Sequence, residues 1–229
     1  MRGKRFKTVF LDFYGTLAAG DADVVEAVCT RIVTELNLSI TPHELVVAWG
    51  DRFFAAIEAN NHDHFRTLYD SECDSLVETL DPVCGRIDPV PFVDQLTEYW
   101  CGPDLHDDVH QTLAQLNLPI CCVSNADTDH LRSAIDRHGL KFDHVVSSQD
   151  ARCYKPRPEI FHRALSAMGA EPHEVLHVGD SLHSDVEGAA NAGIEALWLC
   201  RDRRIYDIRQ TEHDHKISSL KELNAYVRR

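Results

Sequence analysis

The chain has 229 residues, of which 44% are hydrophobic, so it can bury a substantial core as one domain with a large insertion or as two small domains. Its formal net charge of -14, with charges of both signs interspersed along the chain, argues against nucleic acid or an anionic membrane as a partner. A small anionic substrate would therefore need a local positive site.

The amino terminus places four basic residues ahead of a short apolar run at residues 8–11. This run meets Asp12 at once and is too short for a secretory signal or a membrane span, so it predicts a buried strand. The eight cysteines form no C-x-x-C pair, which indicates neither a zinc site nor a compact disulfide framework. Reduced thiols are typical of cytoplasmic proteins, and we predict that location.

The segment after the first strand has the pattern of several helices. Apolar residues recur at helical spacing over residues 24–36, and amphipathic patterns cover residues 45–57 and 65–80. Between them, Thr41 and Pro42 are typical of a helix cap followed by a first-turn proline. A block of helices directly after the first strand predicts an inserted all-helical cap domain at residues 19–95.

The remainder of the chain alternates between strand and helix patterns. Short apolar runs follow segments with helical periodicity, which predicts an α/β fold with a Rossmann-like parallel sheet covered on both faces. We assign this core domain to residues 1–18 and 96–229 and expect a last helix at residues 219–227. The apolar runs lie at residues 119–123, 175–178 and 194–199, with a weaker one at residues 144–146.

Polar side chains stand where these predicted strands end. Asp12 follows the first strand, Ser124 and Asn125 follow the second, and Asp180 follows the strand at residues 175–178. Lys155 lies between these segments, just before a helical pattern. Ligands of parallel sheets bind at the carboxyl ends of the strands, so the sequence predicts one shared site there.

Four motifs in this order resemble those of the haloacid dehalogenase-like hydrolase superfamily, and the resemblance covers nearly the whole chain. The helical insertion after the first motif is similar to the subclass with a helical cap of the first type. The motifs are Asp12-Phe13-Tyr14-Gly15-Thr16, Ser124-Asn125, Lys155, and Gly179-Asp180-Ser181 with Asp185 beyond it.

The resemblance implies that Asp12 is a covalent nucleophile in a Mg²⁺-assisted site. A carboxylate attacks an anionic phosphoryl group poorly unless charge is neutralised, which a divalent cation and a nearby lysine can do. The implied metal ligands are the side chains of Asp12, Asp180 and Asp185 and the backbone carbonyl of Tyr14. Lys155 would screen the charge between Asp12 and the substrate.

The same resemblance implies roles for the smaller polar residues. Ser124 and Asn125 would hydrogen-bond the transferring phosphoryl oxygens, and Thr16 would position the region of the nucleophile. We assign Ser124, Thr16 and Tyr14 to the catalytic set with Asp12 and Lys155. Gly15, which permits a sharp backbone excursion, and Ser181 join Asn125 as expected substrate-binding residues.

Tyr14 departs from the phosphatase pattern, in which a second aspartate at this position protonates the leaving oxygen. Tyrosine, with an ordinary pKa near 10, is a poor general base at neutral pH. Asp-x-Tyr-Gly-Thr resembles the 2-haloacid dehalogenase branch, in which the aspartate attacks carbon. The segment Gly179-Asp180-Ser181 resembles the phosphatase form of its motif, and Phe161 stands where the dehalogenase pattern has tyrosine.

Three functions therefore stay open. The favoured one is a Mg²⁺-dependent phosphatase acting on a small phosphorylated metabolite. A 2-haloacid dehalogenase-like hydrolase and a catalytically weak, metal-binding or regulatory homologue are the alternatives. The sequence leaves the substrate and the oligomeric state open.

Overall fold

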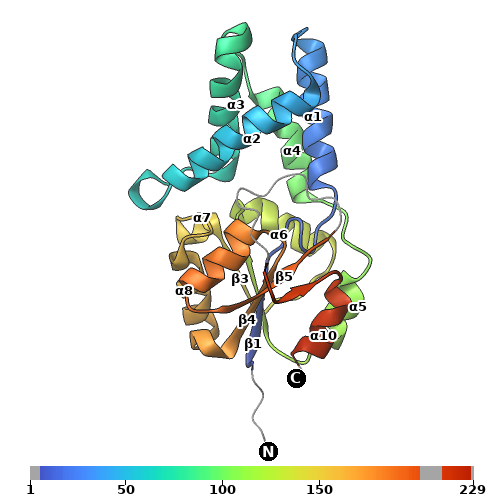
Figure 1. Ribbon diagram of the computed structural model, residues 1–229, viewed down its shortest axis with the longest axis vertical. Coiled ribbons are helices and arrows are strands. Elements are labelled where there is room, and N and C mark those ends of the chain that lie inside the picture. The colour runs from blue at the N-terminus through green and yellow to red at the C-terminus, as the bar shows by residue number, and fades with distance from the viewer. Residues whose placement is uncertain (1–5, 202–212, 228–229) are drawn as a thin grey trace, which may run out of the picture.

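A computed structural model describes residues 6–201 and 213–227. A six-stranded sheet forms the centre, with the strand order β3-β2-β1-β4-β5-β6 and every neighbouring pair parallel (Figure 1). This order is that of a doubly wound Rossmann-like sheet, so the predicted α/β class is confirmed. The strands are β1 (Thr8–Leu11), β2 (Ile120–Ser124), β3 (His144–Ser147), β4 (Val175–Gly179), β5 (Glu195–Leu199) and β6 (Lys216–Ile217).

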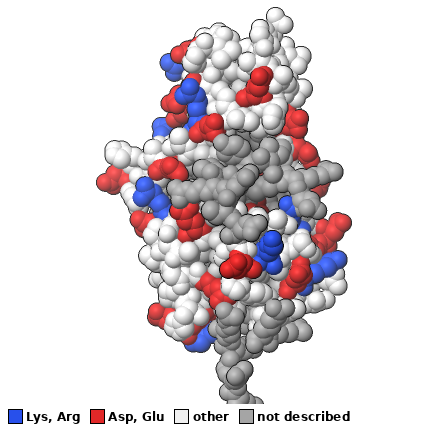
Figure 2. Space-filling model, in the orientation of Figure 1, with Lys and Arg blue, Asp and Glu red and all other residues white. Residues whose placement is uncertain are grey.

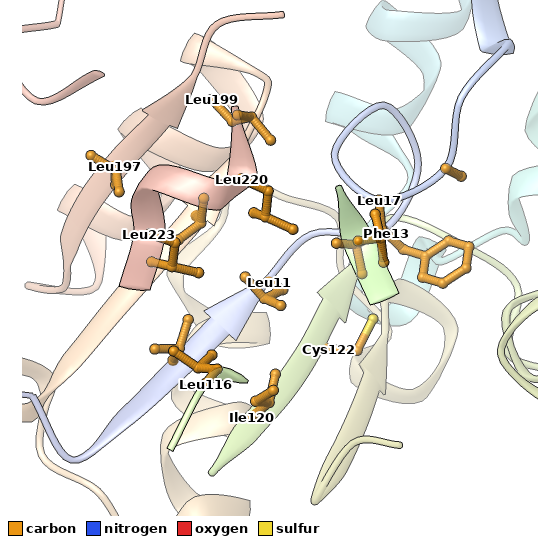
Figure 3. Packing of buried hydrophobic residues seen from close by; sticks show 14 of the residues in the cluster. Leu11, Phe13, Leu17, Leu116, Ile120, Cys122, Leu197, Leu199, Leu220 and Leu223 are labelled. Carbon is orange, nitrogen blue, oxygen red and sulfur yellow. The ribbon is translucent and has the colours of Figure 1, made fainter. Parts of the chain in front are cut away.

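Helices cover both faces of the sheet. Successive side chains of a strand point to opposite faces, so each strand packs against both layers of helices. In β1, Val9 and Leu11 enter one apolar cluster and Phe10 enters the other. Figure 3 shows the first cluster, where Leu220 and Leu223 pack near Leu11. The helices of this layer structure are α5 (Val109–Gln115), α6 (Thr128–Arg137), α7 (Ser148–Ala151), α8 (Pro158–Met168), α9 (Gly188–Asn191) and α10 (Leu223–Tyr226).

Four helices between β1 and β2 form a separate helical unit beyond the carboxyl end of the sheet (Figure 1). Thr41 caps one of them in a capping box with Glu44, and Pro42 occupies the first turn, as predicted. The unit buries an apolar cluster that includes Trp49, Leu76 and Leu96, and Tyr154 of the core also belongs to this cluster. Its helices are α1 (Asp21–Glu35), α2 (Pro42–Ala59), α3 (Leu68–Cys84) and α4 (Val90–Cys101).

The predicted boundary between residues 95 and 96 falls inside α4, a helix that the sequence patterns did not indicate. The last predicted helix, at residues 219–227, is instead a 3-10 turn (Leu220–Glu222) followed by the short α10. Shorter turns lie at His62–His64 and Pro172–Glu174, and a π-helical turn spans Leu182–Glu187.

The core holds the helical unit through buried hydrogen bonds. The Asp127 carboxylate accepts from the backbone N–H groups of Leu68 and Tyr69, at 2.8 and 3.0 Å, and so caps the start of α3. The backbone N–H of Tyr154 donates to the Asn61 side chain at 2.8 Å. These contacts fix the unit above the sheet edge where the predicted site lies.

The surface fits the charge pattern of the sequence. Figure 2 shows acidic and basic side chains interspersed over the visible face, with no broad area of one sign. Among the described residues, none of the helices combines the length and apolar character needed to cross a bilayer.

Candidate active site

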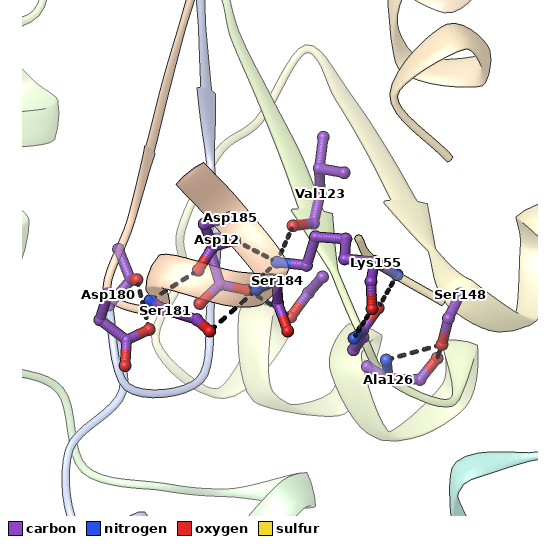
Figure 4. A network of polar contacts seen from close by, with 12 residues as sticks. Asp12, Val123, Ala126, Ser148, Lys155, Asp180, Ser181, Ser184 and Asp185 are labelled. Carbon is purple, nitrogen blue, oxygen red and sulfur yellow. Dashed lines mark hydrogen bonds and ion pairs between the residues drawn. The ribbon is translucent and has the colours of Figure 1, made fainter. Parts of the chain in front are cut away.

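The predicted residues Asp12, Lys155 and Asp180 meet at the carboxyl edge of the sheet (Figure 4). Ser124 lines the same cavity. Asp12 and Asp180 directly follow β1 and β4, and Ser124 is the last residue of β2. Because these three strands are neighbours in the order β2-β1-β4, their carboxyl ends bring the side chains to one place.

Asp12 is fixed from several sides and is only 4% exposed. Its backbone N–H donates to the carbonyl of Val178 at 3.0 Å, which extends the pairing of β1 with β4. Its carboxylate oxygen Oδ1 accepts from Ser124 Oγ at 3.1 Å and from Lys155 Nζ at 2.7 Å. The other oxygen, Oδ2, has no such bond in the described part of the chain, so Asp12 offers a positioned oxygen to a reactant.

Lys155 is the buried positive group of the site. Its ammonium donates to Asp12 Oδ1, to Asp185 Oδ1 at 2.6 Å and to the Val123 carbonyl at 3.1 Å, which uses its three protons. Burial opposes this charge, but the two carboxylates outweigh burial and raise the Lys155 pKa, so the ammonium stays charged.

Asn125 aligns the lysine loop. The Lys155 backbone N–H donates to Asn125 Oδ1 at 2.8 Å, and Asn125 Nδ2 donates to the Lys155 carbonyl at 3.2 Å. The amide group is therefore occupied by the backbone, whereas the sequence resemblance assigns it to phosphoryl oxygens. Asn125 still lines the cavity of the site, so its contact with substrate stays a prediction.

Asp185 is buried and has three partners. Besides Lys155, its carboxylate accepts from the Ser181 backbone N–H at 3.0 Å and shares a 3.0 Å hydrogen bond with His177 Nε2. Burial would raise its pKa, but Lys155 and His177 together lower it, so Asp185 is ionised. The close packing also explains Gly179, because a Cβ there would lie 2.1 Å from Asp185 Cγ.

Three carboxylates form a group that could hold a metal ion. Oxygen atoms of Asp12, Asp180 and Asp185 all lie within 4.8 Å of one another. Gly15, with a φ of 84°, allows this approach, since a Cβ there would lie 2.6 Å from Asp180 Oδ2. Burial and the negative charge of Asp185 raise the pKa of Asp12 against the opposing effect of Lys155. The group offers only carboxylate oxygens as ligands, and its negative charge exceeds the positive charge of Lys155. Both properties fit Mg²⁺.

Thr16 and Ser181 support this group. Thr16 Oγ1 donates to Asp180 Oδ1 at 3.1 Å, so it positions the second carboxylate. Ser181 Oγ accepts from the Ser184 backbone N–H at 3.0 Å and caps the π-helical turn that contains Asp185. Both residues lie at the predicted site. The Thr16 side chain is hydrogen-bonded to a carboxylate, and the Ser181 side chain is hydrogen-bonded to a backbone N–H.

Tyr14 lines the same site but its hydroxyl is engaged elsewhere. It donates to the Trp100 carbonyl at 2.7 Å, and its ring packs edge-on against Phe13 and at a tilt against Tyr99. Burial raises its pKa further above the ordinary value. The hydrogen bond joins the loop after β1 to α4. Because the phenol is neutral and its proton is engaged in this bond, Tyr14 is a weak candidate for proton transfer.

A catalytic cavity of about 210 Å³ lies between the core and the helical unit. Core residues of the motifs form one side. The helical unit supplies residues that sequence reasoning missed, because nothing in its pattern distinguishes them from other helix residues: Asp21, Phe53, Phe54, Ile57, Leu68, Glu72 and Trp100. His177 was also missed, although a histidine inside the otherwise apolar run 175–178 was a visible signal.

Comparisons with known proteins agree with this geometry. A family model described as haloacid dehalogenase-like hydrolase matches residues 6–193. N-acylneuraminate-9-phosphatase of Mus musculus is 29% identical over 128 residues, which are 54% of this chain and 52% of that protein. Pyrophosphatase PpaX of Halalkalibacterium halodurans is 35% identical over 152 residues, 60% of this chain and 70% of that protein. The match thus spans about half the length of the mouse phosphatase.

Solved structures share the whole fold at low identity. L-2-haloacid dehalogenase from Xanthobacter autotrophicus superposes with a TM-score of 0.78 at 22% identity, covering 97% of this chain and 98% of that one. YfnB from Bacillus subtilis, solved bound to magnesium, superposes with a TM-score of 0.76 at 19% identity, covering 98% and 100%. At these identities the likeness concerns the fold alone.

Proposed function

We propose that this chain, which belongs to the haloacid dehalogenase-like hydrolase family, is a Mg²⁺-dependent phosphatase that acts on a small phosphorylated metabolite through an aspartyl phosphate on Asp12. The observation that supports this most is the group of three carboxylates, Asp12, Asp180 and Asp185, two of which, Asp12 and Asp185, pair with Lys155. Attack on carbon with halide departure needs no such acidic group. Curated relatives named as phosphatases favour the same reaction.

Asp12 attacks the phosphorus atom, and the bond from phosphorus to the leaving oxygen breaks. Lys155 holds Asp12 in place and offsets the negative charge that the phosphoryl group brings. Ser124, which contacts Asp12 at 3.1 Å, is placed to hydrogen-bond a phosphoryl oxygen. Water then attacks phosphorus, which releases inorganic phosphate and restores the Asp12 carboxylate.

Mg²⁺ held by Asp12, Asp180, Asp185 and the backbone carbonyl of Tyr14 would neutralise phosphoryl charge during the attack. Thr16 would keep Asp180 in position, since it already donates to this carboxylate. Gly15 would keep the loop close enough to Asp180 for the ligands to converge.

Without an aspartate at position 14, proton donation to the leaving oxygen is weak. The absence of a positioned acid typically costs about 10²- to 10⁴-fold in rate. We therefore expect activated esters and acyl phosphates to be better substrates than alkyl phosphates. The residue at position 14 is also the observation that favours a second function, a 2-haloacid dehalogenase-like reaction in which Asp12 attacks carbon.

The organisation and location of the chain complete the proposal. Residues 1–18 and 96–229 would form the core domain, with 19–95 as a helical cap of the first type that selects the substrate. Eight free thiols fit a cytoplasmic protein.

A panel of phosphomonoesters, acyl phosphates and short 2-haloacids, assayed with Mg²⁺ and with a chelator, tests the proposal. We expect phosphate release that needs Mg²⁺ and falls sharply in Asp180→Asn. Halide release undiminished by the chelator would favour the dehalogenase. Metal binding in calorimetry without turnover of any substrate would indicate the catalytically weak homologue.

A further inference from the structure

A second cavity lies inside the helical unit, next to the catalytic cavity. This lid cavity has a volume of about 250 Å³, room for about eight water-sized volumes of 30 Å³. Apolar side chains from α1, α2 and α4 form most of its wall, namely Val25, Val46, Trp49, Phe53, Phe54 and Leu96. A space of this size and composition suits an apolar organic group.

The two cavities adjoin at four residues that line both: Asp21, Phe53, Phe54 and Glu72. The rings of Phe53 and Phe54 pack edge to face, with centroids 5.7 Å apart. A molecule whose anionic end lies at Asp12 and Lys155 can therefore extend past these residues into the lid cavity. Motif residues of the core line only the catalytic cavity, so the chemistry and the apolar space are separate.

Glu72 carries a half-buried carboxyl group at the junction of the two cavities. The structure gives its side chain no hydrogen bond or ion pair within residues 6–201 and 213–227, and burial raises its pKa to about 8. A half-buried carboxylate without partners loses solvation that a ligand could replace. This pKa leaves much of Glu72 protonated at neutral pH, and an ammonium group on a ligand would favour its ionised form. The oxygens of the ionised form only accept, so the matching ligand group is an N–H or O–H donor.

We propose that the substrate carries, beyond its phosphate, an apolar group that fills the lid cavity and a hydroxyl or ammonium group that donates a hydrogen bond to Glu72. This inference rests on the proposed phosphatase function, because the phosphate end is placed by Asp12 and Lys155. Asp21, the other carboxylate at the junction, would favour the ammonium form of the donor. A short 2-haloacid would leave the lid cavity unfilled.

Calorimetric titration of the Mg²⁺-loaded full chain with non-hydrolysable alkylphosphonates tests the apolar part. Hexylphosphonate should bind more tightly than methylphosphonate, by up to about fourfold for each methylene that is buried. Val46→Phe fills the lid cavity without touching the catalytic one, so it should lower the ratio of hexyl to methyl affinity. An unchanged ratio in this variant, or equal affinities in the wild type, would overturn the inference.

Hexylphosphonates that carry a hydroxyl or an amino group near the phosphonate test the donor. We expect tighter binding of one or both than of plain hexylphosphonate, with the advantage of the amine lost in Glu72→Gln and that of the hydroxyl lost in Glu72→Leu. Glu78→Gln, on the exposed side of the same helix α3, is the matched control and should keep both advantages. Equal losses in the control and in Glu72→Gln would refute the role of Glu72.

These measurements separate the two proposals because they do not depend on turnover. If the phosphonates bind as expected but no phosphate ester is hydrolysed, the phosphatase function fails and the cavity assignment stands. If phosphate is released but chain length and Glu72 leave affinity unchanged, the cavity assignment fails alone. If no phosphonate binds, the cavity assignment fails, and phosphate release from the ester panel decides the phosphatase function separately.

Discussion

Replacing Lys155 with methionine should destabilise the metal-free protein by about 3–5 kcal/mol, the usual cost of removing one partner of a buried ion pair. The lysine side chain is 2% exposed and contacts two carboxylates, at 2.7 and 2.6 Å. Methionine keeps the length of the side chain but leaves Asp12 and Asp185 buried beside each other without their positive partner. Mg²⁺ should recover part of the loss, because it supplies positive charge to the same carboxylates.

The loss should also depend on pH in a defined direction. In the wild type the pKa of Asp185 is lowered, so this group stabilises the fold above its unfolded value and loses that contribution as pH falls through the folded value. In Lys155→Met, burial without the cation raises the pKa of both carboxylates, and they become protonated as pH falls. The difference in unfolding free energy between wild type and variant should therefore shrink toward acidic pH.

Urea unfolding at neutral and mildly acidic pH, with chelator and with Mg²⁺, measures these effects. Lys7→Met is the control, because its ion pair with Glu174 lies at the surface and should change the unfolding free energy little. A metal-free Lys155→Met protein as stable as the wild type at neutral pH would refute the reasoning. So would a difference that grows as pH falls.

Asp12→Asn should abolish turnover while leaving the unfolding transition cooperative, since the amide is nearly isosteric but not nucleophilic; activity above about a tenth of wild type would assign Asp12 a structural role. Tyr14→Phe leaves the Trp100 carbonyl without its donor and should cost about 1–3 kcal/mol in urea unfolding. Its steady-state kcat on alkyl phosphates should stay within about threefold, whereas a loss of about 10²-fold would make Tyr14 the general acid. Gly179→Ala should lower both the melting temperature and Mg²⁺ affinity in calorimetry, because its Cβ would collide with Asp185; wild-type values for both would contradict the packing argument.

The sheet could be predicted because its strands are buried on both faces. Continuous apolar runs bounded by polar residues place the ends of β1, β2, β3, β4 and β5 within one residue of the structure. The two-residue β6 lacks such a run, since Lys216 is exposed and only Ile217 is buried. Helix α4 was missed because the predicted cap boundary lies inside it and divides its apolar residues between two units.

The positions of the site could be predicted, but the pairing of its side chains could not. The order of strands brings Asp12, Ser124 and Asp180 together whatever the rotamers are. Whether Asn125 faces the substrate or the lysine loop depends on hydrogen bonds across 30 residues of chain, which no local pattern encodes. The same holds for Glu72, whose place between the two cavities follows from how α3 packs against α2.

The central claim is that Asp12 attacks phosphorus and not carbon. The most direct test is a single turnover of nitrophenyl phosphate with excess protein and Mg²⁺ in water enriched in the heavy isotope of oxygen, followed by mass spectrometry of the released phosphate and of the peptide that contains Asp12. Water that attacks an aspartyl phosphate at phosphorus should put the label in phosphate and leave Asp12 unlabelled. Label in the Asp12 carboxylate after a single turnover of a 2-haloacid, with no phosphate released from the ester, would contradict the account.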